Sequence, residues 1–209
     1  MIQTIRKAWG IPELRKKIIF TLLILLIFRI GNAITVPYVD VGLLETYLDQ
    51  MGGTILGLYN VMSGGAFAQA TVFALSIQPY INASIIIQLL TVAIPALERL
   101  SKEGEDGRKK LTRITRYTGA GIALALGIGY YFLLRGQGAL VYGSGAQMFA
   151  QVFSAIVVIL AFTAGSLLIQ WLGEQIDVKG IGNGISILIF AGIVSRWTSI
   201  FTTIKTWLG

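Results

Sequence analysis

The sequence predicts an all-α integral membrane protein with five transmembrane helices and one short re-entrant half-helix. Hydrophobic residues make up 55% of the chain and charged residues only 13%, and the mean hydropathy is +0.73, values that exclude an ordinary soluble domain. Uncharged apolar runs alternate with charged segments. One uncharged run, from Gln50 to Leu97, far exceeds the roughly 20 residues that cross a bilayer, so it must fold back or break.

Residues 1–17 predict a cytoplasmic interfacial helix. Ile2, Ile5 and Trp9 recur at helical spacing among basic residues, the pattern of a helix that lies on a membrane surface. Pro12 is expected to end this helix.

The next apolar run predicts a first span over about 18–36, inside a membrane domain of residues 18–209. Its core also has the length of a signal-peptide core behind a basic region. The apolar pattern resumes after Arg29 without a small-residue cleavage site, so we expect a retained span. Basic residues directly before Ile18 predict a cytoplasmic amino terminus.

Two glycine pairs, at 52–53 and 64–65, enclose a segment that predicts a helix only about 14 Å long. Lipid cannot satisfy the unpaired backbone groups at its ends. It is therefore either a loop helix on the outer surface or a re-entrant segment, about 54–65, inside a cavity. Its residues are Thr54, Ile55, Leu56, Gly57, Leu58, Tyr59, Asn60, Val61 and Met62.

A second span, about 76–96, is expected to have Pro79 in its first turn, where the missing amide costs little. On an ideal helix one side carries a stripe that runs from apolar to polar residues and meets either a neighbouring helix or an aqueous passage. The stripe consists of Ile77, Ile81, Ser84, Gln88 and Thr91.

A cytoplasmic loop is predicted at 97–114, where basic residues outnumber acidic ones. It is either a solvated loop with helix caps or a docking surface. Its most basic run is Arg108, Lys109 and Lys110.

Three further spans are predicted, at about 115–134, 146–172 and 183–201. Glycines 180, 182 and 184 do not form a nucleotide loop, because no strand precedes them and no lysine follows at the required spacing. Few basic residues fall in the predicted external segments: Arg135, Arg196 and Lys205. Because cytoplasmic segments of membrane proteins carry most of the basic residues, this distribution predicts a cytoplasmic amino terminus and an external carboxyl terminus.

Four stretches carry a family resemblance: FRIGNAITVPYVD from Phe28, SGGAFAQATVFALSIQPYINASIIIQLLTVAIP from Ser63, SKEGEDGRKKLTRITRYTG from Ser101 and WLGEQIDVKGIGNGISILIFAGIV from Trp171. In order and spacing they resemble the SecY protein-conducting channels. The resemblance covers nearly the whole chain, but only the amino-terminal half of the family's pattern. It implies one half of a pseudo-symmetric inverted repeat of ten spans.

The resemblance also implies roles for individual residues. Ile77, Ile81 and Ile189 would belong to a pore ring that closes by dewetting, and the short helix 54–62 would be the plug. Asn82, Ile85, Gln88 and Thr91 would lie at a lateral gate that opens toward lipid, and the basic run 108–110 would dock cytoplasmic partners.

Catalysis is not expected. The chain contains no histidine and no cysteine, and every acidic residue falls in a predicted loop or segment outside the spans. The resemblance implies no cofactor.

By resemblance, the chain would pass secretory polypeptides across a bacterial plasma (inner) membrane and membrane proteins sideways into lipid. It would work with a carboxyl-terminal half, SecE-like and SecG-like subunits, and the SecA motor or the ribosome, and would meet nucleic acid at most through the ribosome. The alternatives are a homodimeric half-size membrane channel or insertase, and a non-transporting scaffold subunit.

Overall fold

The computed structural model describes residues 11–50, 54–141 and 148–195, and within these ranges the chain is helical with no β-sheet. Residues 1–10 of the expected interfacial helix, the glycine pair at 52–53 and the basic residues after 195 lie outside the described residues. The helices are α2 (Pro12–Gly31), α3 (Val41–Gln50), α4 (Ile55–Met62), α5 (Gln78–Ala93), α6 (Pro95–Lys102), α7 (Glu105–Gly136), α8 (Met148–Lys179) and α9 (Gly184–Ser195).

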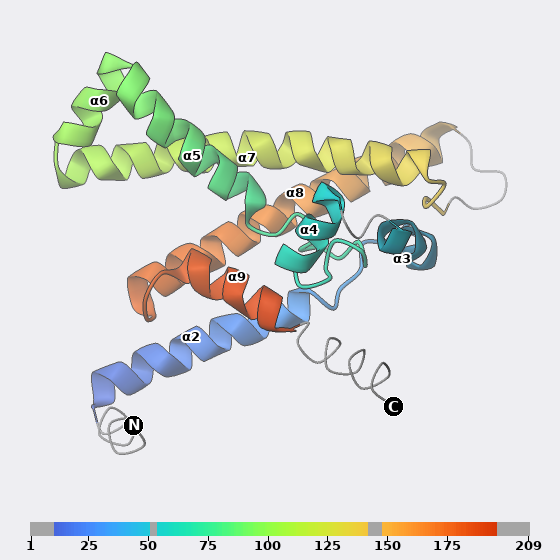
Figure 1. Cartoon of the computed structure of the whole chain (residues 1–209), viewed down its shortest axis with the longest axis horizontal. Helices are drawn as coiled ribbons and strands as arrows, with labels where there is room; N and C mark the ends of the chain where they lie inside the picture. The colour runs from blue at the N-terminus through green and yellow to red at the C-terminus, as the bar shows by residue number, and fades with distance from the viewer. Residues whose placement is uncertain (1–10, 51–53, 142–147, 196–209) are drawn as a thin grey trace.

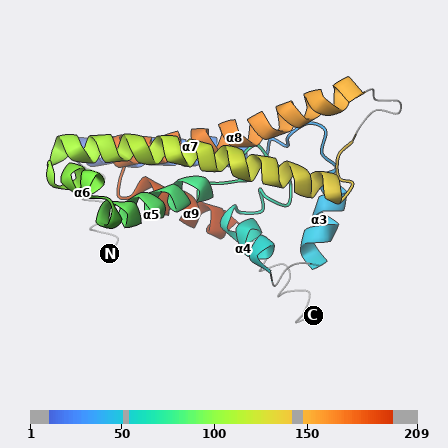
Figure 2. The ribbon, with the colours of Figure 1, turned by 90° about the horizontal axis from the view of Figure 1, so that it is seen from above.

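The two long helices, α7 and α8, are the frame on which the shorter elements pack (Figure 1). Helices α5, α9 and α4 lie along one side of α7 when the molecule is seen from above (Figure 2). Helix α2 packs against α8 and α9. The short helices α4 and α9 are therefore neighbours, although they are far apart in the sequence.

Helices α7 and α8, of 32 residues each, are long and apolar enough to cross a membrane. Helices α5 and α6 form a third candidate span, bent by 102° at Ile94. Helix α9 is apolar but has only 12 residues. The described part of the chain therefore holds two or three clear spans, and the expected number of five is not established by these helices alone.

Helix starts differ from the sequence expectation in two places. Helix α2 begins before the expected start of the first span: Pro12 stands in its first turn, where a missing amide leaves no intrahelical hydrogen bond unmade. Helix α3 lies between the expected first span and the short helix, where no helix was predicted from the sequence. The carboxylate of Asp40 accepts hydrogen bonds from the amides of Gly42 (3.0 Å) and Leu43 (3.2 Å), which is the chemistry of a helix cap.

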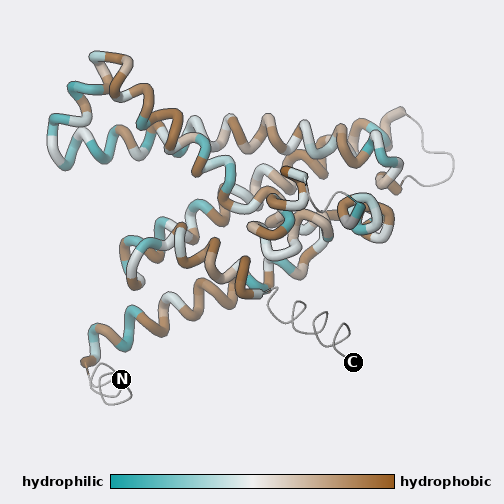
Figure 3. Tube along the Cα trace, viewed as in Figure 1, coloured by the Kyte–Doolittle hydropathy of each residue, from teal (hydrophilic) through white to brown (hydrophobic). Residues whose placement is uncertain are grey.

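The segment 97–114, expected as a loop, is mostly helical. Pro95 begins α6, and Gly104, at φ 78°, makes the turn into α7. Glu105 and Asp106 occupy the first turn of α7, where negative charge is favourable at the helix amino terminus. Hydrophilic residues gather on α6 and the first turns of α7 (Figure 3), so the charged character that the sequence shows is retained in a helical hairpin.

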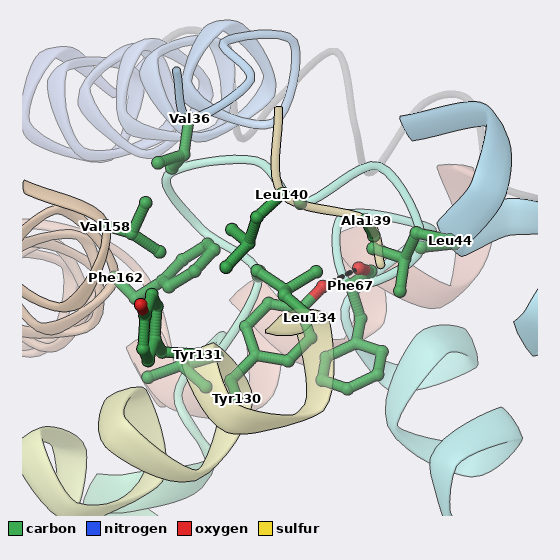
Figure 4. Close-up of a cluster of buried hydrophobic side chains, with 14 of the residues drawn as sticks. Val36, Leu44, Phe67, Tyr130, Tyr131, Leu134, Ala139, Leu140, Val158 and Phe162 are labelled. Atoms are coloured by element: carbon green, nitrogen blue, oxygen red, sulfur yellow. Dashed lines mark hydrogen bonds between the residues drawn. The ribbon is translucent and has the colours of Figure 1, made fainter. Parts of the chain in front are cut away.

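A buried core lies between α3, the segment after α4, and the carboxyl-terminal half of α7 (Figure 4). Phe67 stacks on Tyr130 with ring centroids 4.5 Å apart, and Tyr130 also contacts Phe162 of α8 at 4.7 Å. The Tyr130 hydroxyl donates a hydrogen bond to the Phe67 carbonyl. This core fixes the non-helical segment 63–77 against α7 and α8, and so sets the position of the helix before it.

Candidate functional site

The short helix α4 has a buried side and an exposed apolar side. Ile55, Leu58 and Val61 recur every third residue and are all exposed, whereas Gly57 and Asn60 are buried. Thr54 is the residue before the helix, and Ser63 follows it. The helix occupies most of the range 54–65 that the two glycine pairs predict.

Asn60 ties the end of α4 to the segment that follows. Its side-chain oxygen accepts a hydrogen bond from the amide of Ala68 (3.0 Å), and its carbonyl accepts from the amide of Gly65 (2.8 Å). The hydroxyl of Ser63 donates to the same carbonyl and accepts from the amide of Phe67 (3.0 Å). Sequence reasoning included Asn60 only as a member of the short helix. The signal in the sequence was a side-chain amide within an otherwise apolar helix, because a buried polar side chain needs a hydrogen-bond partner.

The three isoleucines expected at a pore ring lie in one apolar cluster. Ile77 is buried and is the residue just before α5, while Ile81 of α5 and Ile189 of α9 are half-buried. The buried members of the cluster are Ile24, Phe28, Phe73, Ile77, Ile169, Leu172, Ile176 and Leu188. Ile77 and Leu188 of α9 both pack beside Gly173 of α8, so residues more than a hundred positions apart in the chain belong to one cluster.

The residues expected at a lateral gate have different surroundings on α5. Ile85 is half exposed, next to the exposed Ile86, Leu89 and Val92. Gln88 and Thr91 instead face a pocket of about 320 Å³ between α5, α6 and α7. Asn82 is half-buried and does not line this pocket.

The pocket between α5, α6 and α7 is rich in hydroxyl and amide groups. Its lining residues are Tyr80, Ser84, Ile87, Gln88, Thr91, Ser101, Arg108, Leu111, Thr112 and Thr115. Several of the hydroxyls, such as those of Thr91 and Thr112, donate to carbonyls of their own helix. The polar half of the predicted stripe on α5 therefore faces a hollow and not the buried contact with α7 at Ala83.

The basic run 108–110 lies in the first turns of α7. Lys109 and Lys110 make exposed ion pairs with Asp106 (3.7 Å) and Glu103 (3.4 Å). Arg108 lines both the polar pocket and a second hollow along α7 that Arg113 and Arg116 also line. The run is therefore solvent-accessible, and exposed pairs of this kind contribute little to stability.

Comparison with known proteins places these features in a family. The SecY family model matches residues 71–208 of this chain, which is well over half of its length. The chain belongs to the SecY family.

Individual SecY relatives extend the match toward the amino terminus. The chain is 44% identical over 213 residues to the protein translocase subunit SecY of Streptomyces coelicolor, covering 98% of this chain and 48% of that protein. It is 46% identical over 189 residues to the same subunit of Escherichia coli K12, covering 89% and 41%. The chain thus spans about half the length of these relatives.

A solved structure described as a protein-conducting channel is similar in fold to this SecY-family chain. The TM-score is 0.58 at 22% identity, and the match covers 92% of this chain and 41% of the other. The all-helical arrangement is therefore shared with that structure, and the family resemblance read from the four sequence stretches is confirmed.

Within this SecY-type fold, sequence reasoning missed a polar connection between α7 and α8. The guanidinium of Arg116 binds the carboxylate of Glu174 through two hydrogen bonds, and the buried amide of Gln170 donates to the same carboxylate (3.3 Å). Both charged residues are visible in the sequence, but Glu174 lies 58 residues after Arg116. Only the packing of α7 against α8 shows that the two form a pair.

No metal centre emerges from residues 11–50, 54–141 and 148–195, where no three acidic, histidine or cysteine side chains cluster closely enough to hold an ion. The groups gathered around α4 and the isoleucines are apolar side chains, backbone amides and hydroxyls. Such groups can exclude water and make non-directional contacts, which is the chemistry of a passage or a seal.

Proposed function

We propose that this chain forms the amino-terminal half of a SecY-type channel, with α2, α5, α7, α8 and α9 as its five spans. The channel passes secretory polypeptides across a bacterial inner membrane and releases membrane proteins sideways into lipid. The amino terminus is cytoplasmic, as the basic residues at 15–17 favour. A second half, related to this one as the partner of an inverted repeat, completes the structure.

The observation that carries the proposal is the meeting of Ile77, Ile81 and Ile189 in one apolar cluster. A channel for polypeptides must block ions at rest and yet not grip side chains of every kind. A constriction of branched apolar side chains does both, because it dewets when empty and makes only weak, non-directional contacts when occupied. These isoleucines supply this half's share of the ring.

Helix α4 is the plug. It is short and amphipathic, it lies beside α9, and its exposed apolar side of Ile55, Leu58 and Val61 is left for the other half of the channel to cover. In the resting channel it closes the passage, and it moves aside when a polypeptide enters.

Helix α5 forms one wall of the lateral gate. Ile85 belongs to its exposed apolar side, and Gln88 and Thr91 line the polar pocket. A polypeptide segment beside α5 can therefore partition either into lipid or onto a polar surface. Asn82 lies on the same helix, one turn before Ile85. Partition of about 20 apolar residues into hydrocarbon then drives the exit of a membrane span.

The proposed partners are membrane lipid, the carboxyl-terminal half, SecE-like and SecG-like subunits, and the SecA motor or the ribosome. Arg108, Lys109 and Lys110 are accessible for docking on the cytoplasmic side. The partner supplies the energy for secretion, and no cofactor is required of this chain.

A cysteine crosslink tests the pore assignment, because the chain has no cysteine of its own. Ile81→Cys is introduced into the chain co-assembled with its carboxyl-terminal half, and a secretory chain carrying one cysteine is stalled during transport. We expect a disulfide between the two. Phe132→Cys, on the exposed side of α7, is the matched control and should not react.

A crosslink at Phe132→Cys as strong as at Ile81→Cys, or none at Ile81→Cys while the assembled channel still transports, would refute the pore assignment. A chain that assembles only with itself would favour the homodimeric alternative. Mass measurement of the detergent-solubilised complex distinguishes these assemblies.

A further inference from the structure

The turn after α4 rests directly on the backbone of α9. A Cβ atom added to Gly64 would lie 2.7 Å from the carbonyl oxygen of Gly192 and 2.8 Å from the hydroxyl oxygen of Ser195. A Cβ atom added to Gly192 would lie 2.9 Å from the carbonyl oxygen of Met62. These separations are shorter than carbon–oxygen contacts in proteins allow. The two elements can approach this closely only because both positions are glycine.

The turn itself is held by its backbone conformation and by hydrogen bonds to neighbouring residues. Gly64 has φ +69° and Gly65 has φ +91°, conformations that glycine adopts without strain. Hydrogen bonds from the Ala68 amide to the Asn60 side chain and from the Phe67 amide to the Ser63 hydroxyl hold the turn from the other side. The end of α4 and its turn therefore move together. The contact of this turn with α9 sets the position of α4.

Gly192 is also linked to the isoleucine cluster. It follows Ile189 by three positions in α9, so the two lie on neighbouring parts of one side of the helix. Leu188, one turn before Gly192, is buried in the same cluster. A displacement of α9 at Ile189 must therefore also move Gly192.

The other end of α9 is fixed to α8. The amide of Gly184 donates a hydrogen bond to the carboxylate of Asp177 (2.7 Å), and Gly184 packs against the backbone of Gly173. Helix α9 is thus attached at its start and meets the plug near its end. A push on its middle would turn it about the attached end and carry Gly192 away from the turn after α4.

We propose that Gly192 is the positioning residue that seats the plug, and that outward movement of α9 by an entering polypeptide withdraws this seat and releases α4. The inference rests on the proposed channel function. It adds a direct mechanical connection between the constriction at Ile189 and the plug, with Gly64 as the contact surface of the turn in the closed state.

Conductance of the complete channel tests the seat. The chain is co-assembled with its carboxyl-terminal half, reconstituted in planar bilayers, and the resting ion current per channel is measured. We expect Gly192→Ala to raise the resting current severalfold and Gly192→Val to raise it further, because a Cβ displaces the turn. Gly121→Ala is the matched control, since its Cβ would meet nothing within 4 Å.

Deletion of residues 54–62 separates the inference from its premise. The deletion should raise the resting current, and adding Gly192→Ala to it should have no further effect, because the plug is already gone. Transport of a secretory substrate by Gly192→Ala should stay within about twofold of the unmodified channel, which excludes general misfolding.

If the deletion raises the current and Gly192→Ala does not, the positioning role of Gly192 is refuted, whereas the assignment of α4 as the plug is supported. An additive increase in the combined variant also refutes the seat. If the deletion itself leaves the current unchanged, the proposed plug fails, and the seat fails with it.

Discussion

Arg116 of α7 and Glu174 of α8 face each other with two hydrogen bonds, one of them 3.2 Å from the arginine Nε to a carboxylate oxygen. The arginine side chain is 53% exposed, but that of the glutamate is only 17% exposed. The pair joins the two longest helices near the end where the basic residues gather, and the paired fork geometry makes it stronger than a single contact.

We expect Arg116→Ala to lower the free energy of unfolding by about 1 kcal/mol, because it leaves the largely buried Glu174 with only Gln170 as a donor. Thermal unfolding of the detergent-solubilised protein measures the loss. Lys109→Ala is the control, since its pair with Asp106 is exposed on both sides and should contribute almost nothing. The charge-swap variant that combines Arg116→Glu with Glu174→Arg should regain part of the free energy of unfolding lost in Arg116→Ala. If it regains none, the two residues do not form a specific pair.

Tyr130→Phe should lower the free energy of unfolding by about 1 kcal/mol and not more, because only one of two donors to the Phe67 carbonyl is lost. The amide of Ala70 donates to the same oxygen at 3.2 Å and remains. Tyr117→Phe, on an exposed ring, is the control and should be neutral. Denaturant titration compares the two. A loss above about 3 kcal/mol would show that the hydroxyl has another buried role.

Thr21 joins α2 to the turn before α9. Its hydroxyl donates to the carbonyl of Lys17 (2.9 Å) and accepts from the amide of Ile181 (3.2 Å). We expect Thr21→Val to speed hydrogen exchange at the Ile181 amide about tenfold, since the amide loses its acceptor. Thr21→Ser keeps the hydroxyl and should exchange at nearly the original rate. Equal exchange in both variants would contradict the assignment.

Gly165 lets α8 pass close to the segment before α5, because a Cβ there would collide with the carbonyl of Val72. Gly165→Ala should therefore lower stability by roughly 1–3 kcal/mol through forced backbone displacement. Gly129→Ala, where a Cβ meets nothing within 4 Å, should be neutral or slightly stabilising. Thermal unfolding of both proteins decides the point, and similar midpoints would contradict the close approach.

Local sequence signals predicted the elements that depend on local backbone chemistry. Glycines at 64–65 and Pro79 indicate where α4 ends and α5 begins, because positive φ and a missing amide are properties of single residues. The helices α3 and α6 were missed, since charged and polar sequences of this length are compatible with loops as well as with helices. The roles of Ile77, Ile81 and Ile189 in a pore stay a prediction.

Residue types and their order were enough to identify this chain as a helical membrane protein of the SecY family, because hydropathy and local motifs can be recognised in the sequence alone. The contact of the turn after α4 with Gly192, the buried partner of Asn60 and the pair of Arg116 with Glu174 are visible only in the folded chain. Such contacts join residues far apart in the chain, and their existence depends on how helices pack, a property that no local pattern contains.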